Sequence, residues 1–367
     1  MKITKLETFL VKPRWLFLKI HTDEGLVGLG EPILEGRALT CAQAVDELAP
    51  YLIGKDPRRV VHHWQAMYRH AFYRGGPILT SALSGVEQAL WDIAGKSLGV
   101  PVYQLFGGPP RDRIRLYKGG GDPQSIKEWV AKGFTAFKTG VAGGRPARIV
   151  ENKAFVDRSV ERFAALREAA GTEVDIGIDF HGAISPQTAK LLIKALEPYQ
   201  PMFIEEPCQC QNVDVMVEIA RGTHLPIATG ERIFTKWGFR EILEKHAAAI
   251  LQPDLCHAGG INEVRIIAGM AEAYYAGIAP HNPLGPISLA ACIQLDASIP
   301  NFVAQEHTAL GEGYLKNPFV FKDGFVELPT GPGLGIELDE DALEDKLHHD
   351  WRNPETYLQD DNSVVDW

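Results

Sequence analysis

The sequence predicts an α/β protein in which a barrel of parallel strands follows a smaller α+β domain. The pattern of strands and helices changes near Arg115, from strands followed by helices to a regular alternation of the two. Polar groups then recur about every 25 residues, each at the end of a short apolar run. The chain has 367 residues, so a barrel of roughly 250 residues leaves room for a second domain.

The first part of the chain has the α+β pattern. Three strands are expected first, separated by the turn residues of Thr22–Gly25, and three helices follow. The last helix ends before Gly99 and Pro101, which together stop a helix. The strands are Lys2–Val11, Trp15–His21 and Leu26–Gly30, and the helices are Thr40–Leu52, Val60–Ala71 and Leu79–Leu98. We assign residues 1–114 to this domain.

The second part alternates apolar runs with amphipathic stretches such as Pro186–Leu196 and Val213–Ala220, which is the βαβ pattern of a parallel barrel. The runs are AFKTG, DIGIDF, PMFIEEP, PIATGE, AAILQPD, AGIAPH and FVAQE. We assign residues 115–320 to the barrel. Residues 321–367 are polar and rich in Asp and Glu but contain Trp and Tyr, so this segment is expected to pack back onto the body, on the capping domain.

Six polar groups follow the barrel period. The spacings between neighbours are 26, 26, 23, 27 and 25 residues, close to the roughly 25 residues of one βα unit. The groups should therefore lie one per strand at the carboxyl ends of the strands, where barrels of this type carry their chemistry. They are Asp179, Glu205, Glu231, Asp254, His281 and Glu306.

The three leading acids predict a metal site. Acids often follow strands as helix N-caps, but this does not explain acids within apolar runs, such as the first acid of FIEEP. Buried carboxylates are costly and repel each other unless a cation lies between them. Because Asp179, Glu205 and Glu231 offer only oxygen, we expect Mg²⁺, with Mn²⁺ as the alternative.

Two histidines fall in register with these acids. His181 stands two residues after Asp179, on the same face if the strand stays extended. A lone histidine is more often a core or surface residue, but the register favours a site here. Asp254 precedes His281 by one strand and would fix its tautomer. A hard cation, His281 as base and His181 as acid suit proton removal beside a carboxylate and loss of a hydroxyl, with Glu306, when protonated, donating to the oxyanion.

Composition excludes other classes of partner. A net charge of −10 does not suit nucleic-acid binding. No apolar run reaches the roughly 20 residues of a membrane span, and the N-terminus lacks a signal-peptide pattern, so a cytoplasmic location is expected.

The chain resembles the enolase superfamily, in its mandelate racemase-like branch, and is most similar to the galactonate dehydratases. The segments RWLFLKIHTDEGLVGLGEP, FYRGGPIL, FIEEP, LQPDLCHAGGI, APHNPLGPISLAAC and WRNP…DNSVVDW carry this resemblance. It implies a (β/α)₇β modified barrel under an α+β capping domain formed by both chain ends. It also implies Mg²⁺ on the three acids, His181 as acid, His281 as base with Asp254, and Glu306 on the substrate carboxylate. The family's members are often symmetric homo-oligomers.

The implied reaction is dehydration of an acid sugar to a 2-keto-3-deoxy acid. D-galactonate is the first expectation; gluconate, mannonate, a pentonate, or a cofactor-independent racemase or epimerase are the alternatives. Racemases of this branch carry K-x-K where this chain has Lys138, Thr139 and Gly140, so a base on that face is missing. Ala183 replaces the arginine of galactonate dehydratases, and residues 143–149 also differ.

Substrate-binding residues are expected on both domains. The candidates are Glu35 and Arg37 in the loop after the third strand, Tyr73 and Arg74 in the segment FYRGG, and Lys138 in the barrel. Arg74 has an equally good alternative role as a clamp between the domains.

Overall fold

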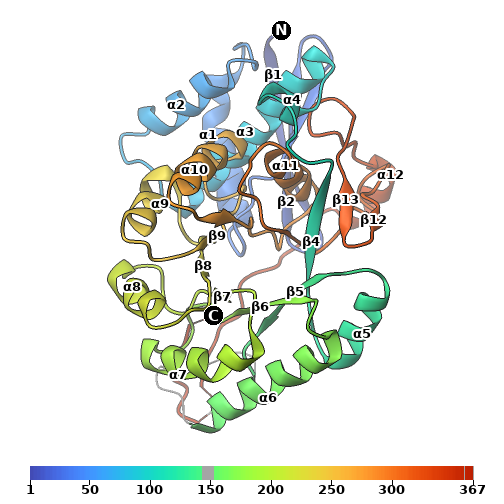
Figure 1. Cartoon of the computed structure of the whole chain (residues 1–367). Coiled ribbons are helices and arrows are strands. Elements are labelled where there is room, and N and C mark those ends of the chain that lie inside the picture. Colours follow the sequence, from blue (N-terminus) through green and yellow to red (C-terminus); the bar gives the residue numbers. More distant parts are fainter. Residues whose placement is uncertain (143–152, 359, 367) are drawn as a thin grey trace.

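The computed structural model describes residues 1–142, 153–358 and 360–366. It contains an α/β barrel with an α+β domain on one side (Figure 1). The differing stretch at residues 143–149 lies outside the described residues. Within the described part of the chain, no helix is long and apolar enough to cross a membrane.

The N-terminal domain is an antiparallel sheet packed against helices. Its sheet has the order β1-β2-β3, and α3 packs against it so closely that a Cβ on Gly30 would lie 1.9 Å from the backbone oxygen of Gly85. Only glycine permits this approach. The strands are β1 Ile3–Val11, β2 Trp15–Thr22 and β3 Val27–Gly30; the helices are α1 Ala38–Leu52, α2 Val60–His70, α3 Pro77–Leu98 and the short α4 Val102–Leu105.

The barrel strands pair in parallel from β4 to β10, and β11 pairs with β4. An isolated parallel bridge from Ile278 to Phe302 closes the ring. The predicted modified barrel with a capping domain is thus confirmed. The strands are β4 Arg113–Gly119, β5 Ala136–Gly140, β6 Asp175–Asp179, β7 Ile204–Glu205, β8 Ile227–Thr229, β9 Ile250–Leu251, β10 Gly277–Ile278 and β11 Gln305–His307.

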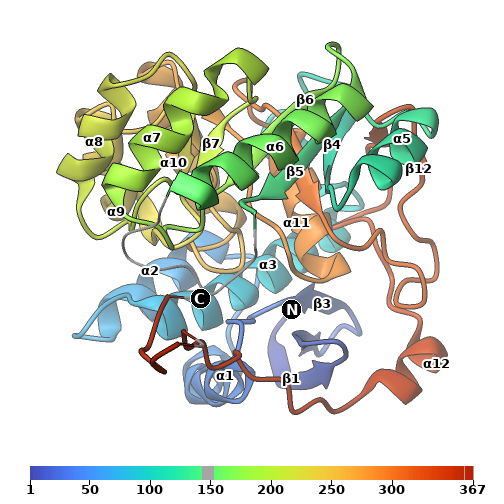
Figure 2. The same ribbon diagram turned by 90° about the horizontal axis from the view of Figure 1, so that it is seen from below.

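Helices connect successive barrel strands and lie outside them (Figures 1 and 2). Several begin at residues that cap a helix well: the side chains of Asp122, Ser185 and Asn212 each accept hydrogen bonds from the first turn of their helix. The helices are α5 Pro123–Ala131, α6 Lys153–Ala170, α7 Pro186–Leu196, η1 Glu197–Tyr199, α8 Val213–Arg221, α9 Thr235–Glu244, α10 Ile261–Ala273 and α11 Pro286–Asp296.

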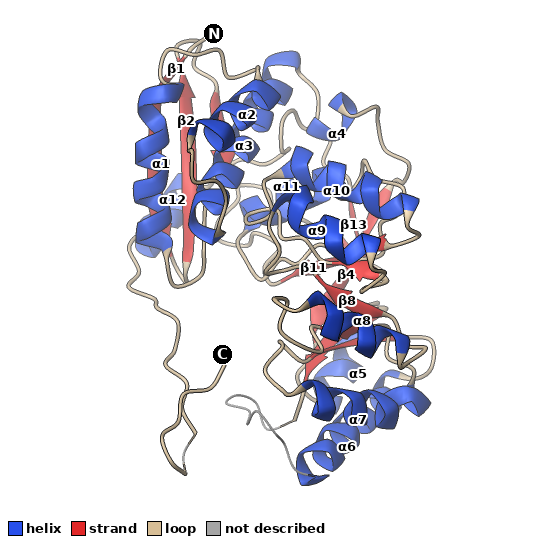
Figure 3. Cartoon of the chain, turned by 90° about the vertical axis from the view of Figure 1, so that its left-hand side faces the viewer, coloured by secondary structure: helices blue, strands red, loops and turns tan. Residues whose placement is uncertain are grey.

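The C-terminal segment contacts both domains. The hairpin of β12 Phe321–Lys322 and β13 Phe325–Glu327 pairs with β4, so residues 321–327 extend the barrel sheet, contrary to the expected packing on the N-terminal domain. After α12 Glu340–Leu343 and η2 Glu344–Lys346, the backbone of His348 bonds to Leu10. The last residues run away from the body (Figure 3).

The capping domain binds the barrel by capping two of its helices. Glu31 accepts hydrogen bonds from the backbone of Gly285 and Ser288 at the start of α11, and Glu87 accepts from Ile261 and Asn262 at the start of α10. Both helices begin after the carboxyl ends of β9 and β10. The capping domain therefore covers that side of the barrel, and α6, α7 and α8 lie far from it (Figure 3).

Candidate active site

The three predicted metal ligands lie at the ends of adjacent strands. Asp179 ends β6 and pairs in register with Glu205, which ends β7. Glu231 lies two residues beyond the end of β8, the next strand of the sheet. Asp179 is 2% exposed and Glu205 is fully buried, so these carboxyl groups at this edge of the barrel are out of contact with water.

The donors of this cluster fit a hard cation. Burial, and then the nearby Asp179, raises the pKa of Glu205 to about 8, which a cation among the carboxylates would reverse. Asp179 Oδ2 is buried and receives no hydrogen bond of good geometry. As the side chains stand, no three His, Cys, Asp or Glu groups among the described residues form a metal-binding set. Glu205 instead contacts Lys138 and Glu231 contacts His281.

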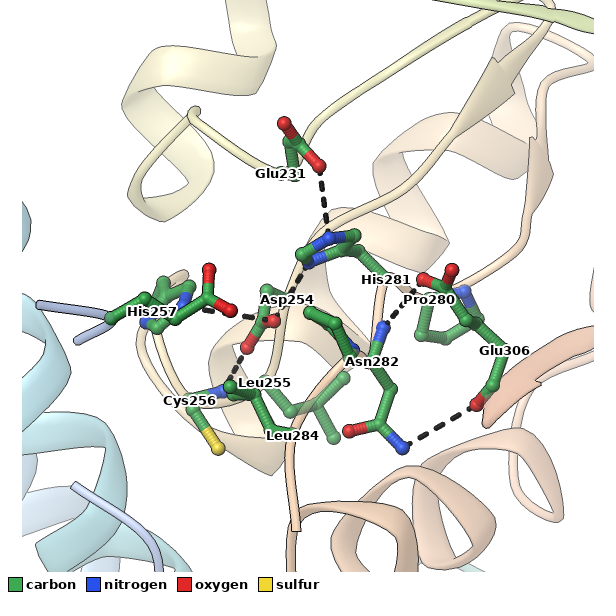
Figure 4. Close-up of polar contacts among 12 residues, drawn as sticks. Glu231, Asp254, Leu255, Cys256, His257, Pro280, His281, Asn282, Leu284 and Glu306 are labelled. Atoms are coloured by element: carbon green, nitrogen blue, oxygen red, sulfur yellow. Dashed lines mark hydrogen bonds and ion pairs between the residues drawn. The ribbon is translucent and has the colours of Figure 1, made fainter. Parts of the chain in front are cut away.

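His281 is held by acids on both ring nitrogens (Figure 4). Its Nδ1 lies 2.9 Å from Asp254 Oδ2, and its Nε2 lies 2.9 Å from Glu231 Oε2. Burial opposes the change, but Glu231 and Asp254 raise the pKa of His281 well above its ordinary value. Asp254 is itself held by the backbone N–H of Cys256, 2.7 Å away.

A further histidine, His257, lies behind the pair of His281 and Asp254. His257 Nε2 is 3.7 Å from Asp254 Oδ2, and its Nδ1 is 3.0 Å from the hydroxyl of Ser81 on capping helix α3. The support of His281 thus extends from the barrel into the capping domain.

Lys138 and Glu306 reach the same cluster from within β5 and β11. Lys138 Nζ, at β5, lies 2.8 Å from both Glu205 Oε1 and Glu306 Oε1. Although burial opposes it, Lys138 lowers the pKa of Glu306. Glu306 is therefore held as a carboxylate here, so the condition under which it would donate a hydrogen bond to the oxyanion is not met in this structure. The backbone N–H of Asn282 donates to its other oxygen at 2.9 Å.

His181 is placed differently. It follows β6 with a φ of 52°, in the left-handed region, so the strand does not continue as the extended i, i+2 argument assumed. The turn still brings His181 Nε2 to 2.8 Å from Asp179 Oδ2. Its side chain is 38% exposed, and the predicted acid thus lies beside the carboxylates on the open side of the barrel.

The four capping-domain candidates do not join this group. Among the described residues we find no hydrogen bond or ion pair that links Glu35, Arg37, Tyr73 or Arg74 to the strand-end carboxylates. Glu35 pairs with Arg14 at 2.7 Å. Arg37 bonds to the neighbouring backbone, and Tyr73 is 85% exposed.

Arg74 lies over Tyr68, whose ring stacks on Trp237 of barrel helix α9. This placement favours the role of a clamp between the domains.

His257, Asn282 and four further polar residues at the site were not singled out from the sequence. Gln252 donates to Glu205 at 2.8 Å; it stands two residues before Asp254, a spacing that could have indicated it. Glu206, Gln209 and Arg232 surround the backbone of the His181 loop. Glu206 and Arg232 directly follow the predicted metal ligands Glu205 and Glu231, and this position in the sequence could have indicated them.

The fold and the site define an acid–base enzyme built on a capped α/β barrel. Residues 7–107 match the N-terminal domain of the mandelate racemase and muconate lactonizing enzyme family, and residues 123–342 match the enolase C-terminal domain-like family. The chain belongs to the enolase superfamily, in that branch, which confirms the resemblance predicted from its motifs.

Relatives match this chain over most or all of its length. D-galactonate dehydratase of Ralstonia nicotianae is 49% identical over 385 aligned residues that span all of both proteins. An enolase of Agrobacterium radiobacter, whose structure contains Na and L-malate, is 32% identical over all of both chains with a TM-score of 0.93. A member of the enolase superfamily from Salmonella Typhimurium is 32% identical over 94% of this chain and 98% of that one, with a TM-score of 0.89.

Proposed function

We propose that this protein is a Mg²⁺-dependent acid-sugar dehydratase and that D-galactonate is its substrate. The observation that carries the proposal is the placement of His281, paired with Asp254, and His181, on two sides of one carboxylate cluster. The 49% identity with a D-galactonate dehydratase over the full chain supports the choice of sugar. A homo-oligomer and a cytoplasmic location stay predictions.

Asp179, Glu205 and Glu231 would hold the cation, with Mn²⁺ as the alternative. When bound, it supplies positive charge that stabilises the extra negative charge on the substrate carboxylate after proton removal. Lys138 lies within 2.8 Å of Glu205 and Glu306, where its ammonium group can bind the same carboxylate.

The two histidines carry the protons. His281 Nε2 takes the proton from C2, and the C–H electron pair moves into the carboxylate to form an enediolate. The electrons then return to make a C2–C3 double bond, the C3–O bond breaks, and His181 Nε2 donates a proton so that the hydroxyl leaves as water. The resulting enol becomes a 2-keto-3-deoxy acid, with no net oxidation or reduction.

Asp254 supports the base. Because it accepts from His281 Nδ1, it keeps the proton on Nδ1, leaves Nε2 as the nitrogen that takes the substrate proton, and stabilises the imidazolium that forms. Gly140 replaces a second lysine on β5, so this face offers one base fewer than a racemase of the branch needs.

A screen of aldonic acids with Mg²⁺ tests the proposal. We expect D-galactonate to give a keto acid detectable with semicarbazide, and EDTA to abolish the signal until Mg²⁺ is restored. A stronger signal with gluconate, mannonate or a pentonate would change the substrate but keep the reaction. No keto acid from any hexonate or pentonate would overturn the dehydratase, and deuterium uptake at C2 without keto acid would indicate a racemase or epimerase.

A further inference from the structure

We propose that Arg232 is a positioning residue that holds the acid, His181, by its backbone. The inference rests on the proposed dehydratase function, because it assigns a task to a residue that does not reach the reacting atoms. Arg232 lies in the loop after β8, next to the predicted metal ligand Glu231.

The guanidinium of Arg232 joins three loops. One terminal nitrogen donates to the backbone oxygen of His181 at 3.2 Å and to Glu206 Oε2 at 2.5 Å. Nε donates to Glu206 Oε1 at 3.2 Å, which completes a two-point contact with that carboxylate. The other terminal nitrogen donates to Gln209 Oε1 at 2.7 Å.

Gln209 closes the arrangement. Its amide nitrogen donates to the backbone oxygen of Gly182 at 3.0 Å, so two consecutive carbonyls of the His181 loop are bound by side chains from other loops. The backbone N–H of Gly182 also donates to the carbonyl of Glu206 at 2.8 Å. We call Arg232, Glu206 and Gln209 the acid-loop clamp.

The His181 loop needs such support. His181 and Glu206 adopt φ values of 52° and 42°, a left-handed conformation that costs non-glycine residues free energy and persists only where their surroundings hold it. Gly182, at φ 61°, leaves space that a Cβ would fill 2.7 Å from the Arg232 guanidinium. The side chain of His181 is 38% exposed, and its Nε2 contacts Asp179 Oδ2 at 2.8 Å.

The clamp therefore serves one half of the reaction. Proton removal by His281 needs no contribution from His181, whereas loss of the C3 hydroxyl needs the acid at the right place. When the clamp is loosened, the enediolate should return to substrate more often and lose water less often.

The test measures this partition in D₂O. For Arg232→Met we expect keto acid formation from D-galactonate to fall about 10-fold, while deuterium enters C2 of recovered substrate at a rate within about 3-fold of wild type. Gln209→Leu removes only the two contacts of the side-chain amide. It should also lower the ratio of keto acid formation to C2 exchange, by a smaller factor. This second variant keeps the test decisive if Arg232→Met does not fold, because it leaves the ion pair with Glu206 intact.

Arg167 provides the matched control. On α6 it donates to the backbone oxygens of Tyr199, Gly171, Val174 and Gln200, which lie before the amino ends of β6 and β7. Arg167→Met also removes an arginine that binds carbonyls, so it should lower stability but leave the ratio of exchange to elimination unchanged.

Hydrogen–deuterium exchange of the metal-free protein adds a readout that needs no turnover. A peptide covering residues 180–184 should lose protection in Arg232→Met but not in Arg167→Met. Suppose that the wild type forms keto acid. If Arg232→Met then has the wild-type ratio of C2 exchange to elimination, or the wild-type amide protection in residues 180–184, the acid-loop clamp is overturned and the proposed function is not. A wild type that dehydrates no acid sugar would overturn the proposed function, and the assignment of Arg232 to an acid with it.

Discussion

The two histidines face each other across the barrel but are supported in different ways. They follow β6 and β10, which lie four strands apart in the sheet. His281 is 8% exposed and is held through its ring by Asp254 and Glu231. The side chain of His181 is 38% exposed; its ring contacts one acid, Asp179, and the acid-loop clamp holds its backbone.

The capping domain accounts for this difference. Its α3 and Glu31 contact the loops after β9 and β10, where the base lies, while the loops after β6, β7 and β8 are fastened to each other. A base must have a fixed tautomer and a fixed pKa, which burial and charged partners provide. An acid that protonates a leaving hydroxyl must meet substrate and release water, so an open position is useful there.

The first prediction separates the two sides. His281→Asn should lower both C2 deuterium exchange and keto acid formation at least about 10³-fold, because the base initiates both. The metal site should remain, which a Mg²⁺ titration followed by tryptophan fluorescence would check.

His181→Asn is the matched variant for the other side. It should lower keto acid formation about 10²-fold and leave exchange within about 3-fold of wild type. Exchange that survives in His281→Asn, or that is lost equally in both variants, would contradict the division of roles.

The positions of the site residues could be predicted from the sequence, but their supports could not. The period of the βα unit placed Asp179, Glu205, Glu231, Asp254 and His281 at strand ends because that geometry depends only on spacing along the chain. Strand β4 was missed because its sequence, RIRLYKG, alternates charged with apolar residues and forms no apolar run.

The supports depend on contacts that no local pattern encodes. Glu31 meets Gly285 across 254 residues of sequence, and the clamp requires left-handed backbone at His181 and Glu206. The capping-domain candidates Tyr73 and Arg74 were predicted from the residue types in FYRGG, and residue types alone do not show where a side chain points.

The second prediction tests how the capping domain holds the base side. Burial raises the pKa of Glu31 to about 8 from a usual 4.5. Because the folded state binds this proton more tightly than the unfolded state, the stabilisation is present below about pH 4.5 and is lost as the pH rises towards 8. Glu31→Gln cannot ionise, so its melting temperature should fall less than that of wild type between pH 5 and pH 8.

The control for this variant is Glu340→Gln, an exposed acid of α12 that pairs with Lys19 and should retain the wild-type slope. An unchanged slope in Glu31→Gln would mean that Glu31 is already ionised in the fold, bound by the helix amides of α11.

The smallest effect is expected furthest from the chemistry, at Ser81. Its hydroxyl donates to the Pro77 carbonyl at 2.6 Å, so it accepts from His257 Nδ1, and this bond ties the partner of Asp254 to α3. Ser81→Ala should lower kcat no more than about 5-fold with KM unchanged, since one neutral hydrogen bond contributes about 1 kcal/mol. Ser84→Ala is the matched control: Ser84 lies on the same helix and binds the backbone of Gly259 instead. If the two variants lowered kcat equally, α3 would support the base only by packing. The hydrogen bond through His257 would then not contribute to the different support of His281 and His181.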